Sequence, residues 1–182
     1  MKRLIVVGAG GHARAVIDAA YASKEWIVEG VVDLKFDGTS EEVLGVPVIG
    51  GAEMIPMFER EDYWFFVAIG GNHERFHVSE SLKKFQVKYA NVIHPLSYVS
   101  SSASLGVGNF LGAFSNIGPS VSIGSFCIVN TSANLEHEVS VGDFSQFAPH
   151  AVVCGRSFVG SKVFLGTNAA VCLLYTSDAA DE

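Results

Sequence analysis

The sequence predicts two folds in one chain, a small α/β domain of the Rossmann type followed by an all-β parallel β-helix. Leu4-Ile5-Val6-Val7 is a short apolar run typical of a buried parallel strand, and it leads directly into the glycine-rich segment Gly8-Ala9-Gly10-Gly11. From Ile93 to Val171 every sixth residue is apolar. That period fits neither an α-helix nor a flat strand, and it is typical of a β-helix built from hexapeptide repeats.

Predicted strands and helices alternate in the N-terminal segment. Residues 13–23 have the apolar periodicity of a helix, and residues 27–32 form a second strand that ends at Asp33. A loop with Gly45-Val46-Pro47-Val48 then leads to a helix at 52–60, a strand at 64–69, a helix at 74–85 and a strand near 88–93. This is one mononucleotide-binding half rather than a complete dinucleotide domain, so a nucleotide or nucleotide-sugar is favoured over NAD.

The glycine-rich segment lies between a strand and the N-terminus of a helix. Backbone N–H groups and the helix dipole favour a phosphate at this place. Asp33 follows about twenty residues further on, where a Rossmann domain places a carboxylate that accepts hydrogen bonds from a sugar ring. The motif Gly8-x-Gly10-x-x-Ala13 is weak by itself, because glycines at strand ends also serve only to allow tight turns.

In the β-helix, the periodic apolar side chains should fill the interior. A second series, four residues after each of them, is small or β-branched almost throughout and should fit beside them. Glycine follows the apolar residue at positions 106, 112, 118, 124, 142, 160 and 166. We expect the turns between faces to fall where glycine and asparagine adopt left-handed dihedrals. The change of pattern predicts a first domain over residues 1–91 and a β-helix over residues 92–171.

Residues 172–182, with the sequence CLLYTSDAADE, interrupt the repeat. They resemble the translation of an adaptor used for sequencing libraries, so we expect a non-native tail and a β-helix that is truncated before its last coils. A native polar tail is the alternative, although this segment lacks the composition of a solenoid cap.

Charge and composition argue against several classes of partner. The formal net charge is −7 and no basic stripe is visible, so no nucleic acid partner is expected. Only Met1-Lys2-Arg3 precede the first strand and no apolar run approaches a membrane span, so a cytoplasmic enzyme without a membrane partner is expected. The cysteines Cys127, Cys154 and Cys172 show neither pairing nor metal-ligand spacing.

One charged segment stands out in the otherwise small and neutral β-helix, Leu135-Glu136-His137-Glu138-Val139. With Leu135 and Val139 pointing inward, His137 lies on the outer wall near a corner. A histidine is the usual side chain for taking a proton near neutral pH, and an adjacent carboxylate fixes its tautomer. Such a pair suits the deprotonation of an amine or hydroxyl that attacks a thioester. A solvated histidine between two charged neighbours is the alternative.

Several short segments carry a resemblance to a known family. They are Gly8-Ala9-Gly10-Gly11-His12, Gly30-Val31-Val32-Asp33, Gly45-Val46-Pro47-Val48-Ile49-Gly50, Ala68-Ile69-Gly70-Gly71-Asn72, Ile93-His94-Pro95, Asn130-Thr131 and Glu136-His137-Glu138. Through them residues 3–171 resemble the bacterial sugar acyltransferases of the sialic acid O-acetyltransferase type, whose close relatives N-acetylate UDP-4-amino-sugars. The resemblance implies a left-handed β-helix, a homotrimer with active sites between subunits, and acetyl-CoA along the helix wall.

The resemblance also implies roles for individual residues. The general base of the family matches His137, with Glu138 orienting it. Apart from the resemblance, we expect a backbone N–H on the neighbouring wall to stabilise the oxyanion, and we assign this to Gly155, which lies at a corner one coil beyond His137. The positions assigned to the substrate are Gly10, Gly11, His12, Asp33, Leu34 and Gly70, and relatives often have an acidic residue in place of Leu34. Two positions are expected beside the coenzyme: Gln146, where relatives commonly have a histidine, and Thr167.

We therefore expect an acetyl-CoA-dependent acetyltransferase, without a metal, that acts on an amino or hydroxyl group of a nucleotide-linked sugar or sialic acid. Three alternatives stay open. A zinc hydratase on the same fold would need three converging histidines, whereas the β-helix offers His137 and His150 with Gln146 between them. An NAD-dependent enzyme would use the glycine-rich segment but needs a second half-sheet. A non-catalytic sensor of sugar-nucleotides would need the N-terminal residues without the pair at 137–138.

Overall fold

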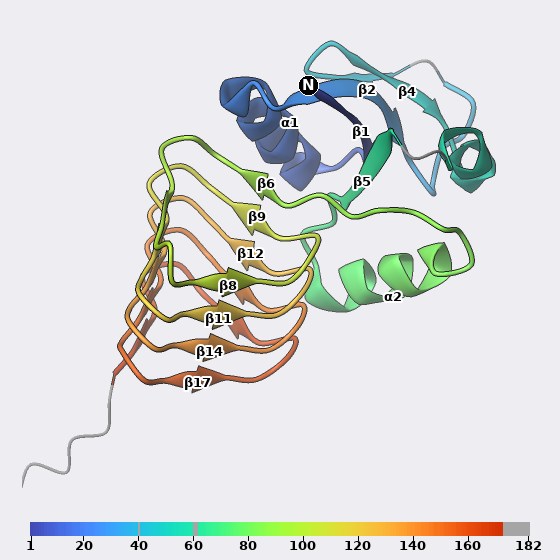
Figure 1. The fold of residues 1–182 in the computed structure, drawn as a ribbon. Helices are drawn as coiled ribbons and strands as arrows, with labels where there is room; N and C mark the ends of the chain where they lie inside the picture. Colours follow the sequence, from blue (N-terminus) through green and yellow to red (C-terminus); the bar gives the residue numbers. More distant parts are fainter. Residues whose placement is uncertain (40, 60–61, 173–182) are drawn as a thin grey trace, which may run out of the picture.

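A computed structural model describes residues 1–39, 41–59 and 62–172. The α/β domain lies at one end of the β-helix and against one of its faces (Figure 1). Of the predicted tail, all but Cys172 lies outside the described residues. No helix in the described ranges is long and apolar enough to cross a membrane.

The N-terminal sheet has the strand order β3-β4-β2-β1-β5. Its strands are β1 (Lys2–Val7), β2 (Trp26–Val32), β3 (Glu42–Val43), β4 (Val46–Gly50) and β5 (Tyr63–Val67). All neighbours are parallel except β3 and β4, which form an antiparallel hairpin. The prediction of a loop at Gly45–Val48 is wrong, because Leu44 and Gly45 both have positive φ and form the tight turn that such a hairpin requires.

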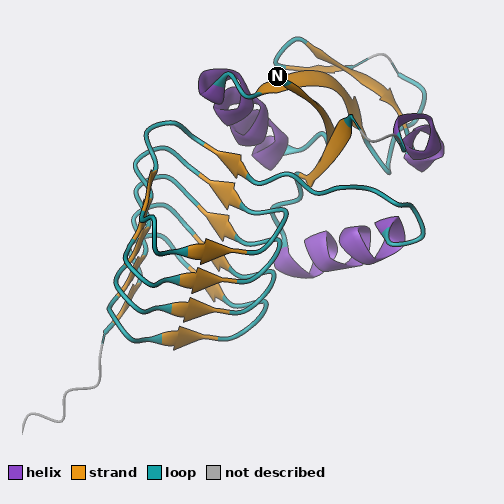
Figure 2. Ribbon diagram, in the orientation of Figure 1, coloured by secondary structure: helices purple, strands orange, loops and turns teal. Residues whose placement is uncertain are grey.

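Three helical segments accompany the sheet: α1 (Gly11–Ser23), η1 (Ala52–Phe58) and α2 (Asn72–Leu82) (Figure 2). The predicted helix at 52–60 is a 3₁₀ helix, and Pro56 within it has no N–H to donate to an α-helical hydrogen bond. The strand predicted near 88–93 is also wrong in part. Within this segment, only Tyr89 pairs with the N-terminal sheet, through a single β-bridge to Phe65. Val92–Ile93 is β6, which belongs to the β-helix.

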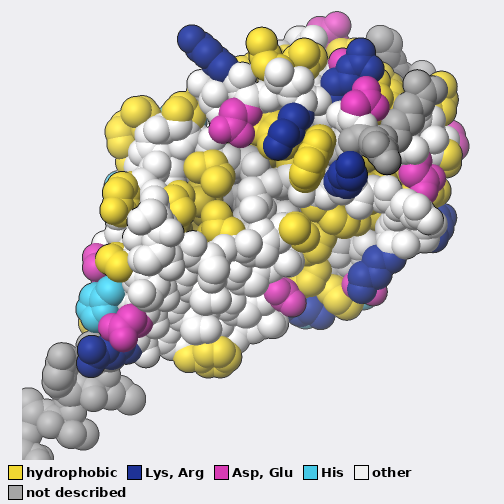
Figure 3. All heavy atoms as spheres, viewed as in Figure 1, with side chains coloured by type: hydrophobic (Ala, Val, Ile, Leu, Met, Phe, Trp, Pro, Cys, Tyr) yellow, Lys and Arg dark blue, Asp and Glu magenta, His cyan; other side chains and the backbone are white. Residues whose placement is uncertain are grey.

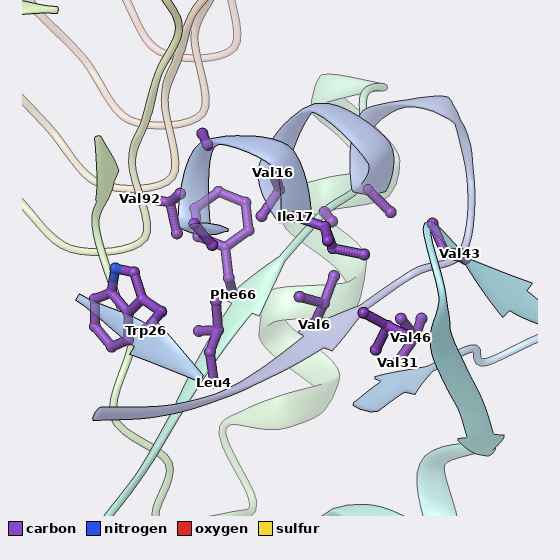
Figure 4. Packing of buried hydrophobic residues seen from close by; sticks show 14 of the residues in the cluster. Leu4, Val6, Val16, Ile17, Trp26, Val31, Val43, Val46, Phe66 and Val92 are labelled. Atoms are coloured by element: carbon purple, nitrogen blue, oxygen red, sulfur yellow. The ribbon is translucent and has the colours of Figure 1, made fainter. Parts of the chain in front are cut away.

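Both faces of the N-terminal sheet are covered. Leu4, Val6 and Phe66 pack with α1 on one face, and Val92 of β6 joins this cluster (Figure 4). Ile5 and its neighbours point to the other face, toward η1 and α2. This alternation explains why the first strand is apolar at consecutive positions.

The β-helix consists of two-residue strands in three parallel sheets, each named here by its first strand. The β6 sheet contains β6, β9 (Phe110–Leu111), β12 (Ile128–Val129), β15 (Gln146–Phe147) and β18 (Phe164–Leu165). The β7 sheet contains β7 (Tyr98–Val99), β10 (Asn116–Ile117), β13 (Asn134–Leu135), β16 (Val152–Val153) and β19 (Ala170–Val171). The β8 sheet contains β8 (Ser104–Leu105), β11 (Ser122–Ile123), β14 (Ser140–Val141) and β17 (Phe158–Val159).

Strand register confirms the hexapeptide repeat. Asn116 pairs with Asn134 and Ile117 with Leu135, so each residue stacks on the one 18 positions later and one coil contains three hexapeptides. The fold is a left-handed parallel β-helix, as the resemblance implied. Both predicted interior series are buried in its central coils, the apolar one at Leu111, Ile117 and Leu135 and the small one at Cys127 and Ala133.

The prediction that glycine and asparagine provide the left-handed turns is wrong for most corners. The left-handed residue is the third after each interior apolar residue, and ten consecutive corners have φ between 57° and 62° without a glycine. They are Phe114, Ser120, Phe126, Ser132, Glu138, Phe144, His150, Arg156, Lys162 and Asn168. Backbone hydrogen bonds offset this strain, because amides such as those of Phe126 and Glu138 donate to carbonyls of the preceding coil.

Glycine is needed in the repeat for a different reason, the close stacking of coils. At Gly142 an added Cβ would lie 2.6 Å from the backbone nitrogen of Ser161, and at Gly118 it would lie 3.0 Å from that of His137. Gly106, Gly112, Gly118, Gly124 and Gly142 therefore mark positions where the next coil leaves no room for a side chain.

Candidate active site

The carboxyl ends of β1, β2 and β5 open into a cavity of about 650 Å³, at the edge where open α/β sheets bind ligands. All six positions that the resemblance assigns to the substrate line this cavity together. They are Gly10, Gly11, His12, Asp33, Leu34 and Gly70. Since they come from three separate loops, the fold brings together residues that are up to sixty positions apart in the sequence.

The glycine-rich segment forms the N-terminus of α1. Gly10 is the N-cap, and no side chain in the described part of the chain caps this helix end. An added Cβ at Gly10 or Gly11 would meet no other atom of residues 1–39, 41–59 and 62–172 within 4 Å, so these residues leave the space in front of the helix N-terminus open. N–H groups of a first helical turn that face such a space can bind an anion such as a phosphate.

His12 is held in an apolar setting beside this N-terminus. Its ring packs edge-on against Phe110, with 5.0 Å between centroids. Burial, with the nearby charge of Arg75, lowers the pKa of His12 to about 4, so the ring is neutral at physiological pH. The buried Nε2 has no hydrogen-bond partner in the described part of the molecule, which is rare for a buried polar atom. That nitrogen is available to a polar group of a ligand.

Asp33 lies opposite the glycines, after β2. One carboxylate oxygen accepts the backbone N–H of Lys35 at 2.9 Å, which fixes the side chain at the mouth of the cavity. The ammonium group of Lys35 pairs with Glu74 at 3.1 Å, and both of these residues line the cavity. Sequence analysis singled out neither of them, although Lys35 is only two residues from Asp33.

A second cavity, of about 520 Å³, adjoins the first at Gly70. Its other walls include the start of α2 and the outer face of the β6 sheet at Gln146 and Phe164. The predicted coenzyme position Gln146 therefore lies next to the first cavity. Thr167, the other predicted coenzyme position, is exposed on the corner after β18 and does not line this cavity.

Arg75, fully buried in α2, connects the two domains. Its guanidinium group donates to the carbonyls of Ile69 and Gly70 at the first cavity, and to those of Phe126 and Phe144 at a corner of the β-helix, at 2.8–3.1 Å. A fifth hydrogen bond goes to the side chain of Asn72. With all its donors used, Arg75 fixes the loop at residue 70 relative to the coils.

His137 lies on the corner between the β7 and β8 sheets, half exposed, as the sequence indicated. Its Nδ1 is 2.9 Å from a carboxylate oxygen of Glu138. Because a carboxylate only accepts, this contact favours the tautomer of the neutral ring that has its proton on Nδ1 and its lone pair on Nε2. The pKa of the Glu138 carboxyl is below its ordinary value because of the hydrogen bonds from His137 and then Arg156. The arrangement suits an imidazole that accepts a proton at Nε2.

Gly155 lies directly beside that nitrogen, one coil further on. A Cβ added at Gly155 would collide with Nε2 and Cε1 of His137. The amide of Gly155 makes no hydrogen bond to another described residue, so it can donate to a ligand near the imidazole. The structure thus brings together the three positions expected to act on the reacting group, and it adds Arg156, which the sequence analysis missed. Its position 18 residues after Glu138, one coil in a hexapeptide helix, is the signal that would have found it.

The imidazole and the cavity at the carboxyl ends of β1, β2 and β5 lie on opposite sides of one chain. The α/β domain packs on the β6 sheet, where Val92, Phe110 and Ile128 are buried in its core. The corner with His137 lies between the β7 and β8 sheets, so the β6 sheet does not contribute to it. Figure 3 shows histidine, acidic and basic side chains at this edge of the β-helix. Across the described ranges, no three His, Cys, Asp or Glu side chains are grouped to hold a metal ion.

Comparison with known proteins agrees with this architecture. Residues 3–82 match the PglD N-terminal domain. UDP-N-acetylbacillosamine N-acetyltransferase from Bacillus subtilis (strain 168) is 32% identical over 116 residues, which cover 61% of this chain and 51% of that protein. The chain spans about half the length, or less, of the curated relatives that it matches.

Solved structures extend the match to both domains. A mutant of GDP-perosamine N-acetyltransferase from Caulobacter crescentus, in complex with CoA and GDP-perosamine, is 30% identical with a TM-score of 0.71, covering 94% of this chain and 89% of that one. The chain belongs to the PglD-type sugar acetyltransferase family. A second solved structure, the acetyltransferase domain of PglB from Neisseria gonorrhoeae FA1090, has a TM-score of 0.77 at 28% identity, covering 94% of this chain and 92% of that one.

Proposed function

We propose that this chain transfers the acetyl group of acetyl-CoA to an amino group of a nucleotide-linked sugar, with His137 as the general base. The observation that carries the proposal is the His137 imidazole, held by Glu138 at Nδ1 with its free Nε2 against Gly155, in a chain that also has a nucleotide cavity. The relatives from Bacillus subtilis and Caulobacter crescentus are N-acetyltransferases by name, which supports an amine acceptor. The Caulobacter protein was solved with CoA and the PglB acetyltransferase domain with acetyl coenzyme A, which supports this coenzyme.

The reaction follows from these positions by direct transfer in a ternary complex. The acceptor nitrogen attacks the acetyl carbonyl while Nε2 of His137 takes its proton. The backbone N–H of Gly155 stabilises the oxyanion, a contribution of about 3 kcal/mol for one such donor. The C–S bond then breaks, the new C–N bond remains, and the proton on His137 passes to the departing thiolate of CoA.

The buried cysteine of the β-helix, Cys127, is unsuited to an acyl-enzyme route. Cys127 lies in the interior of the β-helix, and burial raises the pKa of its thiol to about 11. A nucleophilic cysteine needs an accessible thiolate instead. Direct transfer to the sugar therefore fits the chain better.

The active site of this proposal is completed by a second copy of the chain. Since one chain holds its nucleotide cavity and its His137 on opposite sides, a sugar bound in one copy can reach only the imidazole of another. A cyclic homotrimer provides three equivalent sites of this kind. Acetyl-CoA would lie along the β-helix wall near Gln146 and Thr167, and the diphosphate of the sugar-nucleotide at the N-terminus of α1.

The test is an assay of the purified protein with acetyl-CoA and a UDP- or GDP-linked 4-amino-sugar, following free thiol and the mass of the sugar product. We expect N-acetylated product from the wild type, and in His137→Ala a rate lower by about a hundredfold or more, the usual scale for a lost general base. Nucleotide-sugar binding should stay unchanged in that variant. Binding without product in the wild type, or near-normal turnover in His137→Ala, would contradict the proposal, the first outcome in favour of a sensor.

A further inference from the structure

The carboxylate that orients His137 has a second partner from the next coil. Nε of Arg156 donates to the same oxygen of Glu138 that accepts Nδ1 of His137, at 3.0 Å and 2.9 Å. The backbone amide of Arg156 also donates to the carbonyl of His137 at 2.9 Å. Arg156 is therefore tied to both members of the pair, once through the backbone and once through the side chain.

This contact contributes little to folding. The side chains of Arg156 and Glu138 are 71% and 50% exposed, and ion pairs with such exposure are worth little in water. Its consequence is geometric instead. The backbone of Glu138 is fixed, since its amide donates to the carbonyl of Pro119 at 2.9 Å, but an exposed carboxylate is otherwise free to turn into solvent. A second donor on the same oxygen restricts that rotation.

Resting on the proposed function, we infer that Arg156 is a positioning residue which holds the Glu138 carboxylate on Nδ1 of His137, so that Nε2 stays the proton acceptor beside Gly155. Glu138 must remain an ionised acceptor for this, and a guanidinium group, which is always charged, favours the carboxylate form. Arg156 acts through Glu138 and needs no contact with the substrate. The other N–H groups of Arg156 make no hydrogen bond to another described residue, so an anchor for the phosphates of the coenzyme is the competing role.

A double-mutant cycle separates the two roles. Arg156→Gln should lower kcat by about tenfold with both KM values nearly unchanged, on the scale of a misplaced catalytic group. In a Glu138→Gln background the same change should have no further effect, because the carboxylate that Arg156 holds is gone. Arg156→Lys should keep part of the activity, and Lys84→Gln, which removes a surface charge in the other domain, should leave it unchanged.

Two kinetic outcomes would overturn the inference. An unchanged kcat in Arg156→Gln, or an equal fall in both backgrounds, shows that Arg156 does not act through Glu138. A higher KM for acetyl-CoA with kcat unchanged assigns Arg156 to the coenzyme instead.

Nitrogen-15 NMR of the imidazole tests the inference without turnover, and so separates its failure from that of the proposed function. In the wild type His137 should be mainly the tautomer with the proton on Nδ1. In Arg156→Gln it should be a mixture of both tautomers, and an unchanged spectrum would refute the positioning role even in a protein that proved to be inactive.

Discussion

At residue scale, the proposed site depends on the missing side chain at position 155. In Gly155→Ala the new methyl group would occupy the place of Nε2 of His137, so the imidazole must turn away. We expect kcat to fall by about tenfold or more, since small displacements of a reacting group cost that much, and nucleotide-sugar binding to be retained. Gly166→Ala is the matched control, because an added Cβ there meets no atom of the described residues within 4 Å. Equal activity in Gly155→Ala and Gly166→Ala would mean that the His137 imidazole does not take part in the reaction.

The burial of His12 predicts how the stability of the fold depends on pH. Its pKa of about 4 in the fold lies below the ordinary value of 6.5, so the unfolded chain takes up a proton first as pH falls. The folded state therefore keeps its full stability above pH 6.5. As the pH falls toward 4, the free energy of unfolding decreases by about 3 kcal/mol at most because of His12. Urea midpoints at pH 7.5 and 5.0 should therefore differ less in His12→Gln than in the wild type. The exposed His77 offers the control, since His77→Gln should keep the full difference.

The sequence predicted a site residue where its partner lies close by in the chain, and missed it where the partner is distant in sequence. His137 and Glu138 are neighbours in sequence, so the pair was visible at once, and the six cavity positions came from motifs at strand ends. Arg156, Lys35 and Glu74 were missed because each meets its partner only through the fold, across one coil or between α2 and the loop after β2. Such charged residues look like ordinary surface positions until the coils are stacked.

At the scale of elements, the close spacing of the coils explains most of the periodic glycines. Gly142→Ala forces a methyl group against the backbone of Ser161, whereas at Gly160 the nearest atom to an added Cβ is 3.9 Å away, in Val163. We expect Gly142→Ala to lower the free energy of unfolding by about 1–3 kcal/mol, the usual cost of overpacking. Gly160→Ala should change it little, because no described residue comes closer to the added Cβ than Val163. Circular dichroism during urea unfolding measures both. Similar losses in the two variants would show that the glycines act through backbone freedom instead.

The six-residue period sufficed to predict the β-helix and its interior, because only that fold repeats an apolar position at this spacing. It could not predict the left-handed corners. Ten of them carry side chains from Phe to Lys, whose conformation is set by hydrogen bonds to the preceding coil rather than by local preference. Likewise, propensity alone did not distinguish the 3₁₀ helix at 52–58 from an α-helix.

At the scale of the whole molecule, the central claim is that His137 of one copy acts on a sugar held by the N-terminal domain of another. The most direct test combines two inactive variants, His137→Ala and Gly11→Val, the second with a side chain that blocks the approach of phosphates to α1. Each alone should be nearly inactive. Co-expressed in equal amounts, they should recover about a quarter of wild-type activity, because random assembly of a closed ring gives that share of sites with both parts intact. The control pairs His137→Ala with a chain carrying both changes, where nothing should be recovered. Absence of recovery in co-purified mixed oligomers of the two single variants would contradict the claim.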